Sequence, residues 1–191
     1  MGDRDPANGY SPPGRIAERR LTEIVTPKSF SGSATLIRNL LSLAARQNQI
    51  IAFIDGNDSL DVTQIEQSVL SRMLWVRCRD AIKTLQAADL VLRDNNFPLV
   101  LVDLKSNAES QLRKIPSTSW YRFQRLVEET ATVCLIFTPR MMVSPAQVRI
   151  TCHSRCALNM LEDSPAGILG QIKLEVFDRR QFHEAEGASV A

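Results

Sequence analysis

The chain has 191 residues, with 44% hydrophobic residues, 23% charged residues and a formal net charge of +2. This length and apolar content suit one soluble globular domain with a full hydrophobic core. A net charge this close to zero does not by itself indicate a nucleic-acid partner. A basic binding site would have to come from local clustering of lysine and arginine.

The sequence also bears on cellular location. No apolar run approaches the roughly 18 residues of a membrane-spanning helix, and the first residues are polar and rich in proline and glycine, unlike a signal peptide. Two of the four cysteines, Cys78 and Cys134, lie within apolar runs. We expect a cytoplasmic protein with free thiols.

From residue 20 onward, apolar runs of strand length alternate with stretches of helical period. Strands are predicted for "RLTEIVT", "QIIAFID", "MLWVRC", "FPLVLVDL" and "TVCLIFT", of which the last two are continuous apolar runs typical of central strands. Helices are predicted for "ATLIRNLLSLAAR", for the segment capped by Asp80, and for "STSWYRFQRLVEE" with a Ser/Thr cap. The pattern predicts an α/β fold with a mostly parallel central sheet flanked by helices.

The last part of the domain has a different pattern. The segments "QVRITCHSR" and "GQIKLEVFDRR" alternate apolar and polar residues, which is typical of half-exposed strands at a sheet edge. We expect these C-terminal strands to be antiparallel. Residues 1–19 are predicted to be a flexible arm and residues 181–191 a flexible tail, so the folded domain should span residues 20–180.

A series of short motifs follows one another in a recognisable order. They are "TPKSFSGSATL", "IAFIDGNDSLD", "LWVRCRDAIKTLQAADLVLRDNNFPLVLVDL", "CLIFTPR", "VRITCHSR" and "IKLEVFDRR". Their order and spacing resemble the RecA recombinase core over almost the whole predicted domain. The chain is most similar to reduced relatives of RecA: the ImuA proteins that accompany translesion polymerases and, more distantly, the cell-division inhibitor SulA. The resemblance implies a RecA-like sheet of the P-loop NTPase type.

The segment "TPKSFSGSATL" lies where the resemblance places a phosphate-binding loop. Such a loop needs glycines, a lysine for the β- and γ-phosphates and a hydroxyl for Mg²⁺. Gly32 matches the glycine before the lysine, but the lysine position falls on Ser33 and the hydroxyl position on Ala34. The loop begins at Thr26 and Pro27. We predict a degenerate phosphate loop and no cofactor.

Two nearby residues do not restore the missing groups. Lys28 lies near the strand end and Thr35 lies one residue too far along the helix, where a step of about 100° turns its hydroxyl away. An alternative interpretation of the loop is a simple helix start capped by Ser31 or Ser33.

Further positions that the resemblance assigns to ATP hydrolysis have also changed. The glutamate that activates water, two residues after the remnant acid Asp55, corresponds to Asn57, and an amide cannot accept the proton. The glutamine that senses the γ-phosphate corresponds to Arg140. Asp103 does match the acid that holds magnesium indirectly. We predict that the protein has no catalytic residues and does not hydrolyse ATP.

One basic and aromatic segment is the main candidate for partner contact. It is "SQLRKIPSTSWYRFQR", and its candidate residues are Arg113, Lys114, Trp120, Tyr121, Arg122 and Arg125. Arginines can meet phosphates while rings stack on bases, so weak contact with single-stranded DNA is one interpretation. Burial of Trp120 and Phe123 in the core is the alternative. In the short link "RMMVSPAQ", Met141 and Met142 suit either a protein partner or core packing.

Two other clusters are given no function. The first comprises Arg72, Arg77, Arg79 and Lys83 around the third strand, and we interpret it as a solvated rim. The second is "TCHSRC", in which strand alternation should point Cys152 and His153 to opposite faces. With no partner pair of ligands in the sequence, we predict no metal site.

The sequence leads to one leading hypothesis and two alternatives. The first is a non-catalytic RecA-like accessory protein in DNA damage tolerance, which binds RecA or a translesion polymerase complex. The second is a SulA-like division inhibitor that binds FtsZ. The third is an ATP-binding RecA-like ATPase with an aberrant phosphate loop.

Overall fold

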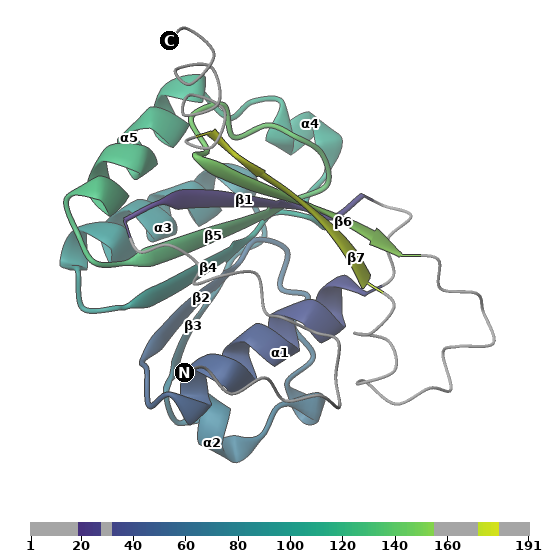
Figure 1. Cartoon of the computed structure of the whole chain (residues 1–191), viewed down its shortest axis with the longest axis vertical. Helices are drawn as coiled ribbons and strands as arrows, with labels where there is room; N and C mark the ends of the chain where they lie inside the picture. The colour runs from purple at the N-terminus through teal and green to yellow at the C-terminus, as the bar shows by residue number, and fades with distance from the viewer. Residues whose placement is uncertain (1–18, 28–31, 155–171, 180–191) are drawn as a thin grey trace, which may run out of the picture.

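The residues that the structure describes form one seven-stranded sheet in the order β3-β2-β4-β5-β1-β6-β7 (Figure 1). The structure is a computed structural model and describes residues 19–27, 32–154 and 172–179. Apart from Arg19, the predicted arm and tail lie outside these residues. The strands are β1 (Leu21–Val25), β2 (Ile51–Asp55), β3 (Met73–Arg77), β4 (Leu99–Asp103), β5 (Val133–Thr138), β6 (Val148–Ser154) and β7 (Ile172–Asp178).

The sheet is mostly parallel, as predicted. Strands β1 to β5 pair in parallel, and β6 pairs in parallel with β1. Only the β6–β7 pair is antiparallel, so β6 is a parallel strand on one side and an antiparallel one on the other. The two continuous apolar runs became β4 and β5, which lie inside the sheet and are almost fully buried. Solid apolar strands need cover on both faces, and the helices supply it.

Helices cover the two faces of the sheet. They are α1 (Ser33–Arg46), α2 (Gln67–Leu70), α3 (Ala81–Asp94), α4 (Glu109–Leu112) and α5 (Ser117–Glu128), with a 3₁₀ turn η1 (Val62–Gln64) before α2. Helices α1 and α2 lie on one face, and α3, α4 and α5 lie on the other (Figure 1). Each face therefore has its own apolar core.

Local chemistry explains how α3 begins and ends, whereas α5 begins without a side-chain cap. The Oδ1 atom of Asp80 accepts hydrogen bonds from the backbone N–H groups of Ile82 (2.9 Å) and Lys83 (3.1 Å), which confirms the predicted cap of α3. Asn95 ends α3 in the left-handed conformation (φ 54°), which asparagine tolerates well. The predicted Ser/Thr cap of α5 is wrong, because Pro116 occupies the N-cap position and no side chain caps that helix.

The cysteines that the structure describes are free thiols, as predicted. Cys134 and Cys152 are buried, while Cys78 is half-buried at the end of β3. Burial raises the pKa of Cys134 to about 12 and that of Cys152 to about 12. These thiols therefore stay protonated and act as small apolar groups. Cys156 lies outside the described residues.

Candidate functional site

The candidate site lies at the carboxyl ends of the parallel strands, where α/β sheets usually bind ligands. The register pairs Asp55 of β2 with Asp103 of β4, so two acidic residues end neighbouring strands side by side. Thr26 follows β1, and Ser33 begins α1. All four residues are at least nine-tenths buried. The sheet topology thus brings together the residues that the sequence suggested for a phosphate site.

A lysine from the loop after β4 contacts the start of α1. The Nζ atom of Lys105 lies 2.5 Å from the Oγ atom of Ser33 and donates a hydrogen bond to it. Ser33 is the residue that matches the lysine of a phosphate loop, so an ammonium group does reach this position, but from the loop after β4. Sequence analysis missed Lys105. The signal was present, since "LVLVDLK" puts a lysine two residues beyond a strand-end acid.

The start of α1 differs from the alternative interpretation of the loop, a helix capped by Ser33. Gly32 is the N-cap residue, and among the described residues no side chain caps the helix. The predicted cap by Ser33 is therefore wrong, because Ser33 lies within the first turn and its hydroxyl meets Lys105. Ala34 is exposed, and because it is an alanine it offers no hydroxyl at this position. Lys28 and Ser31 lie outside the described residues.

Asp103 is a buried carboxyl whose charge is disfavoured. Burial raises the pKa of Asp103 to about 6, although the ammonium group and backbone N–H of Lys105 act in the opposite direction. That N–H donates to Asp103 Oδ1 at 3.0 Å. The nearby charge of Asp55 raises the pKa further. Asp103 and Lys105 thus form a coupled pair beside the start of α1.

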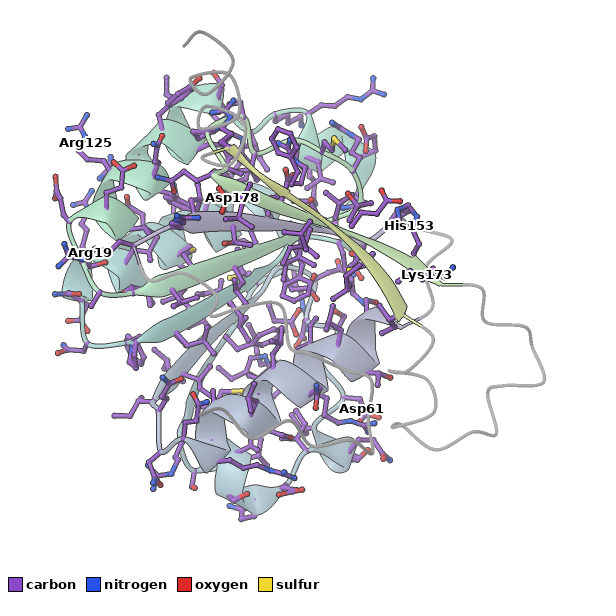
Figure 2. The ribbon with its side chains drawn as sticks, viewed as in Figure 1. Arg19, Asp61, Arg125, His153, Lys173 and Asp178 are labelled. Carbon is purple, nitrogen blue, oxygen red and sulfur yellow. The ribbon has the colours of Figure 1, made fainter. Side chains whose placement is uncertain are left out.

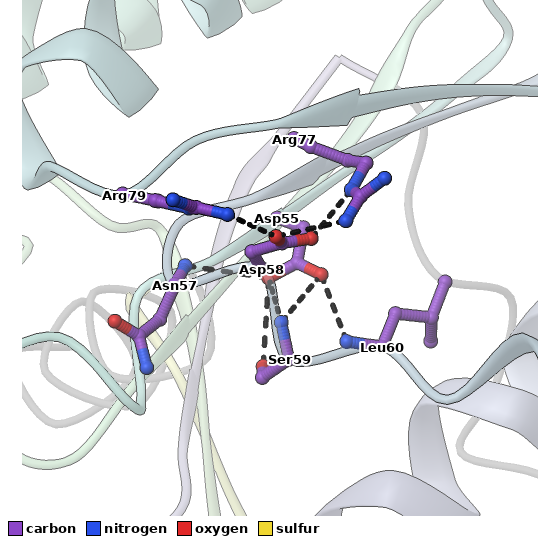
Figure 3. A network of polar contacts seen from close by, with 7 residues as sticks. All are labelled: Asp55, Asn57, Asp58, Ser59, Leu60, Arg77 and Arg79. Atoms are coloured by element: carbon purple, nitrogen blue, oxygen red, sulfur yellow. Dashed lines mark hydrogen bonds and ion pairs between the residues drawn. The ribbon is translucent and has the colours of Figure 1, made fainter.

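The carboxylate of Asp55 holds its own loop (Figure 3). It accepts hydrogen bonds from the backbone N–H groups of Ser59 (2.9 and 3.0 Å), Leu60 (2.9 Å) and Asn57 (3.3 Å), with the Ser59 hydroxyl at 3.4 Å. These donors use both carboxylate oxygens. Asp55 therefore serves as a loop anchor, and Asn57 is exposed at the tip of that loop.

Gly56 joins the loops after β2 and β4. Its N–H donates to the carbonyl of Asp103 at 2.9 Å, and its carbonyl accepts from the Asn107 amide at 2.8 Å. A Cβ atom at Gly56 would overlap both the Asp103 carbonyl and the Asn107 side chain. Glycine is required here because two segments of chain approach the backbone closely.

Arg140, which the resemblance matches to the γ-phosphate sensor, contacts helix α4. Its Nε and Nη2 atoms lie 3.1 and 2.9 Å from Oε1 of Glu109 in α4. Arg113 contacts the same oxygen at 3.1 Å. Hydrogen bonds from Arg140 and then Arg113 lower the pKa of Glu109, which keeps this exposed cluster ionised at neutral pH.

The basic and aromatic segment divides into buried and exposed parts. Trp120 is only 2% exposed and packs edge-on against Phe123 with ring centroids 6.1 Å apart, so its assignment as a contact residue is wrong and the core alternative holds. Arg122 pairs with Asp89 of α3 at 2.5 Å. Tyr121 is exposed.

Two cations of this segment remain on the surface. Lys114 and Arg125 are exposed, and neither forms an ion pair with another described residue. Figure 2 shows Arg125 extending outward from α5. One turn separates Tyr121 from Arg125, so the two share the outer face of the helix. This face, formed by Tyr121 and Arg125, is called the α5 face below.

The described residues contain no group of three or more His, Cys, Asp or Glu side chains placed to hold a metal ion. Cys152 is buried and His153 is exposed, as strand alternation predicts. His153 instead lies 3.4 Å from Glu175 of β7. Cys156 and His183 lie outside the described residues.

Comparison with known proteins adds no identification. A scan against models of protein families finds no match, and a search of curated proteins finds none. Among the described helices, none is long and apolar enough to cross a membrane.

Proposed function

We propose that this protein is a cytoplasmic, non-catalytic RecA-like accessory protein of DNA damage tolerance, which binds RecA or a translesion polymerase complex. The sequence resemblance supports the link to DNA damage. The observation that carries the non-catalytic part is the contact of Lys105 with Ser33, because this contact fills the start of α1 from within the chain.

Three further features support the loss of hydrolysis. Asp55 spends both carboxylate oxygens on the N–H groups of its own loop. Asn57 cannot act as a general base, and Ala34 offers Mg²⁺ no hydroxyl. A triphosphate would thus meet neither a complete metal site nor a group that activates water. What remains is a rigid sheet that presents surfaces.

Two exposed parts of the molecule suit a protein partner, Met141 and the α5 face. Met141 is 59% exposed in the link after β5, and Tyr121 is 57% exposed. Methionine adapts to irregular partners, and tyrosine and arginine are enriched where protein interfaces bind most strongly. These exposed groups favour a function in protein binding over a catalytic function.

A direct binding experiment tests the proposal. Immobilised protein would be incubated with purified RecA, with RecA on single-stranded DNA, and with a translesion polymerase complex. We expect retention of at least one of them, and loss of retention in Tyr121→Ala or Met141→Glu. Leu43→Glu is the matched control, because Leu43 is 49% exposed on α1. Absence of retention in every arm would remove the proposal, and arrest of FtsZ assembly would favour the division inhibitor.

One observation favours an alternative, an ATP-binding domain with an aberrant loop. Lys105 brings an ammonium group to the helix start that would otherwise lack one. Isothermal titration with ATP and Mg²⁺ separates the two functions. The proposed function predicts no binding, whereas micromolar binding that is lost in Lys105→Met would establish the alternative.

A further inference from the structure

A second basic surface lies at the end of β3, next to the loop that Asp55 anchors. Asp58, Arg77, Cys78, Arg79 and Lys83 line an open cavity of about 480 Å³ between the loop after β2 and the first turn of α3. The volume is within the range of small-ligand pockets. From the sequence we interpreted these arginines and this lysine as a solvated rim, but the structure shows an organised arrangement.

Asp58 holds Arg77 in one position (Figure 3), and Trp75 makes a second contact with it. The Nε and Nη2 atoms of Arg77 lie 2.5 and 2.9 Å from the two carboxylate oxygens of Asp58, a paired geometry that fixes the guanidinium plane. The guanidinium also lies over the ring of Trp75, 4.9 Å from its centroid. The hydrogen bond from Arg77 lowers the pKa of Asp58, so the carboxylate stays ionised at neutral pH.

The loop places Asp58 for this role through its backbone. Asp58 has a φ of 53°, in the left-handed region that non-glycine residues seldom adopt. Its neighbour Ser59 is fixed by hydrogen bonds to Asp55 at the end of β2. The anchored loop therefore presents Asp58 to the end of the adjacent strand β3.

The cavity carries more positive than negative charge. Three cationic side chains and one carboxylate line it. Arg79 contacts Asp58 by a single interaction of 3.4 Å and is 85% exposed, so its remaining donors are available. Lys83 is exposed and forms no ion pair with a described residue. Asp80, the nearest acid on α3, uses Oδ1 to accept from the N–H groups of that helix.

We propose that this cavity binds the phosphate groups of a single-stranded nucleic acid, with Arg79 and Lys83 contacting phosphates and Arg77 held in place as a third donor. Arg77 is 59% exposed and Arg79 more so, which suits a strand that passes along an open surface. None of the residues that line the cavity is aromatic, and the guanidinium of Arg77 already lies over the ring of Trp75. Binding is therefore independent of base sequence.

The inference does not depend on the proposed function, because the cavity lies on β3 and α3 and excludes both Met141 and the α5 face. A phosphate-binding surface here would hold whether or not the chain associates with RecA. A negative result in the retention experiment would therefore leave this proposal standing, and a negative result with the oligonucleotide would leave the proposed function standing.

Fluorescence anisotropy with a labelled thymidine oligonucleotide of about ten nucleotides tests the proposal over a series of salt concentrations. On a single strand, each phosphate contact contributes about 0.7 to the slope of log K against log salt. We expect the double variant Arg79→Gln, Lys83→Gln to lower this slope by about 1.4. The matched control is Arg46→Gln, Arg72→Gln, which removes the same charge at the opposite ends of the strands and should leave the slope unchanged.

Amide chemical shifts of the unmodified protein give a second measurement that needs no variant. The oligonucleotide should shift the N–H signals of residues 77–84 more than those at the opposite ends of the strands. Inorganic phosphate, added alone, should shift the same signals more weakly. No oligonucleotide binding, equal loss in both double variants, or shifts caused by phosphate but not by the oligonucleotide would each overturn the proposal.

Discussion

The ammonium group of Lys105 lies 2.5 Å from the hydroxyl of Ser33, although 72 positions separate the two residues. Lys105 belongs to the loop after β4, and Ser33 opens α1. Their contact places a positive charge beside the buried Asp103 and at the start of a helix. The ammonium group of Lys105 opposes the effect of burial on the pKa of Asp103.

Removal of the Lys105 charge should raise the pKa of Asp103 above its present value of about 6. The ammonium group favours the ionised carboxyl and so lowers the pKa of Asp103. Lys105→Met removes this effect, while burial continues to raise the pKa. The measurement is an NMR titration of the Asp103 carboxyl carbon. Lys83→Met, a lysine outside this site, should leave the titration unchanged. A pKa that stays the same or falls in Lys105→Met would contradict the contact.

The same carboxyl should make stability depend on pH between about 4 and 6. The pKa of Asp103 is about 6 in the folded protein, whereas the ordinary value of this carboxyl, taken for the unfolded chain, is 3.8. Between these two pH values the folded state therefore binds more protons than the unfolded state. The free energy of unfolding therefore falls as pH rises through this window, by about 3 kcal/mol when complete.

Urea denaturation across this pH range measures the effect. Asp103→Asn keeps an acceptor for the Lys105 N–H but does not ionise, so its stability should lose this dependence on pH. Glu129→Gln changes an exposed acid and should keep it. An identical dependence in Asp103→Asn and the unmodified protein would show that another group is responsible.

Glu23 should be the most costly single polar residue to remove. It is fully buried in β1, and it accepts hydrogen bonds from Arg149 Nε (2.7 Å), Thr138 Oγ1 (3.0 Å) and the N–H groups of Met142 (2.7 Å) and Val143 (3.1 Å). Glu23→Ala leaves Arg149 without its carboxylate partner, at a cost of about 3–5 kcal/mol in the free energy of unfolding.

Chemical denaturation at neutral pH would measure this loss. Glu175→Ala serves as the control, because the Glu175 side chain is 79% exposed and its removal should change stability by less than about 0.5 kcal/mol. Equal effects of the two substitutions would contradict the assigned role of Glu23.

Substitution of the adjacent residues Trp120 and Tyr121 in α5 should have different effects on stability and on partner binding. Trp120→Ala opens a cavity in the core and should lower the free energy of unfolding by about 3–5 kcal/mol. Tyr121→Ala changes an exposed ring and should alter stability by no more than about 0.5 kcal/mol while weakening retention of the protein partner. Denaturation and retention measured on both variants separate the roles, and a stable Trp120→Ala variant would refute the packing described.

Gly56→Ala should destabilise the protein by about 1–3 kcal/mol, because the added Cβ overlaps the Asp103 carbonyl and the Asn107 side chain. The double variant Gly56→Ala, Asn107→Ala relieves only the side-chain overlap, so it should not restore stability. Thermal unfolding of both variants checks this, and full recovery in the double variant would show that the backbone contact is not limiting.

Local pattern predicted much of the fold. Apolar runs predicted the positions of the strands. Asp80 predicted the start of α3, because a capping side chain accepts hydrogen bonds from N–H groups only two and three residues away. Alternation placed Cys152 inside and His153 outside for the same reason. The sequence left open whether Trp120 packs in the core with Phe123 or contacts a partner, since helical spacing allows either role.

The sequence by itself determined the strands, most of the helices and the absence of a lysine in the first loop, because each depends on residues within a few positions of one another. Only the tertiary structure decided that Lys105 meets Ser33, that Arg149 meets Glu23 and that Asp58 fixes Arg77. These contacts arise from the order of the strands in the sheet and from where the crossovers bring chain segments together. Residue periodicity carries no record of that order, so distant pairs of charges become visible only after folding.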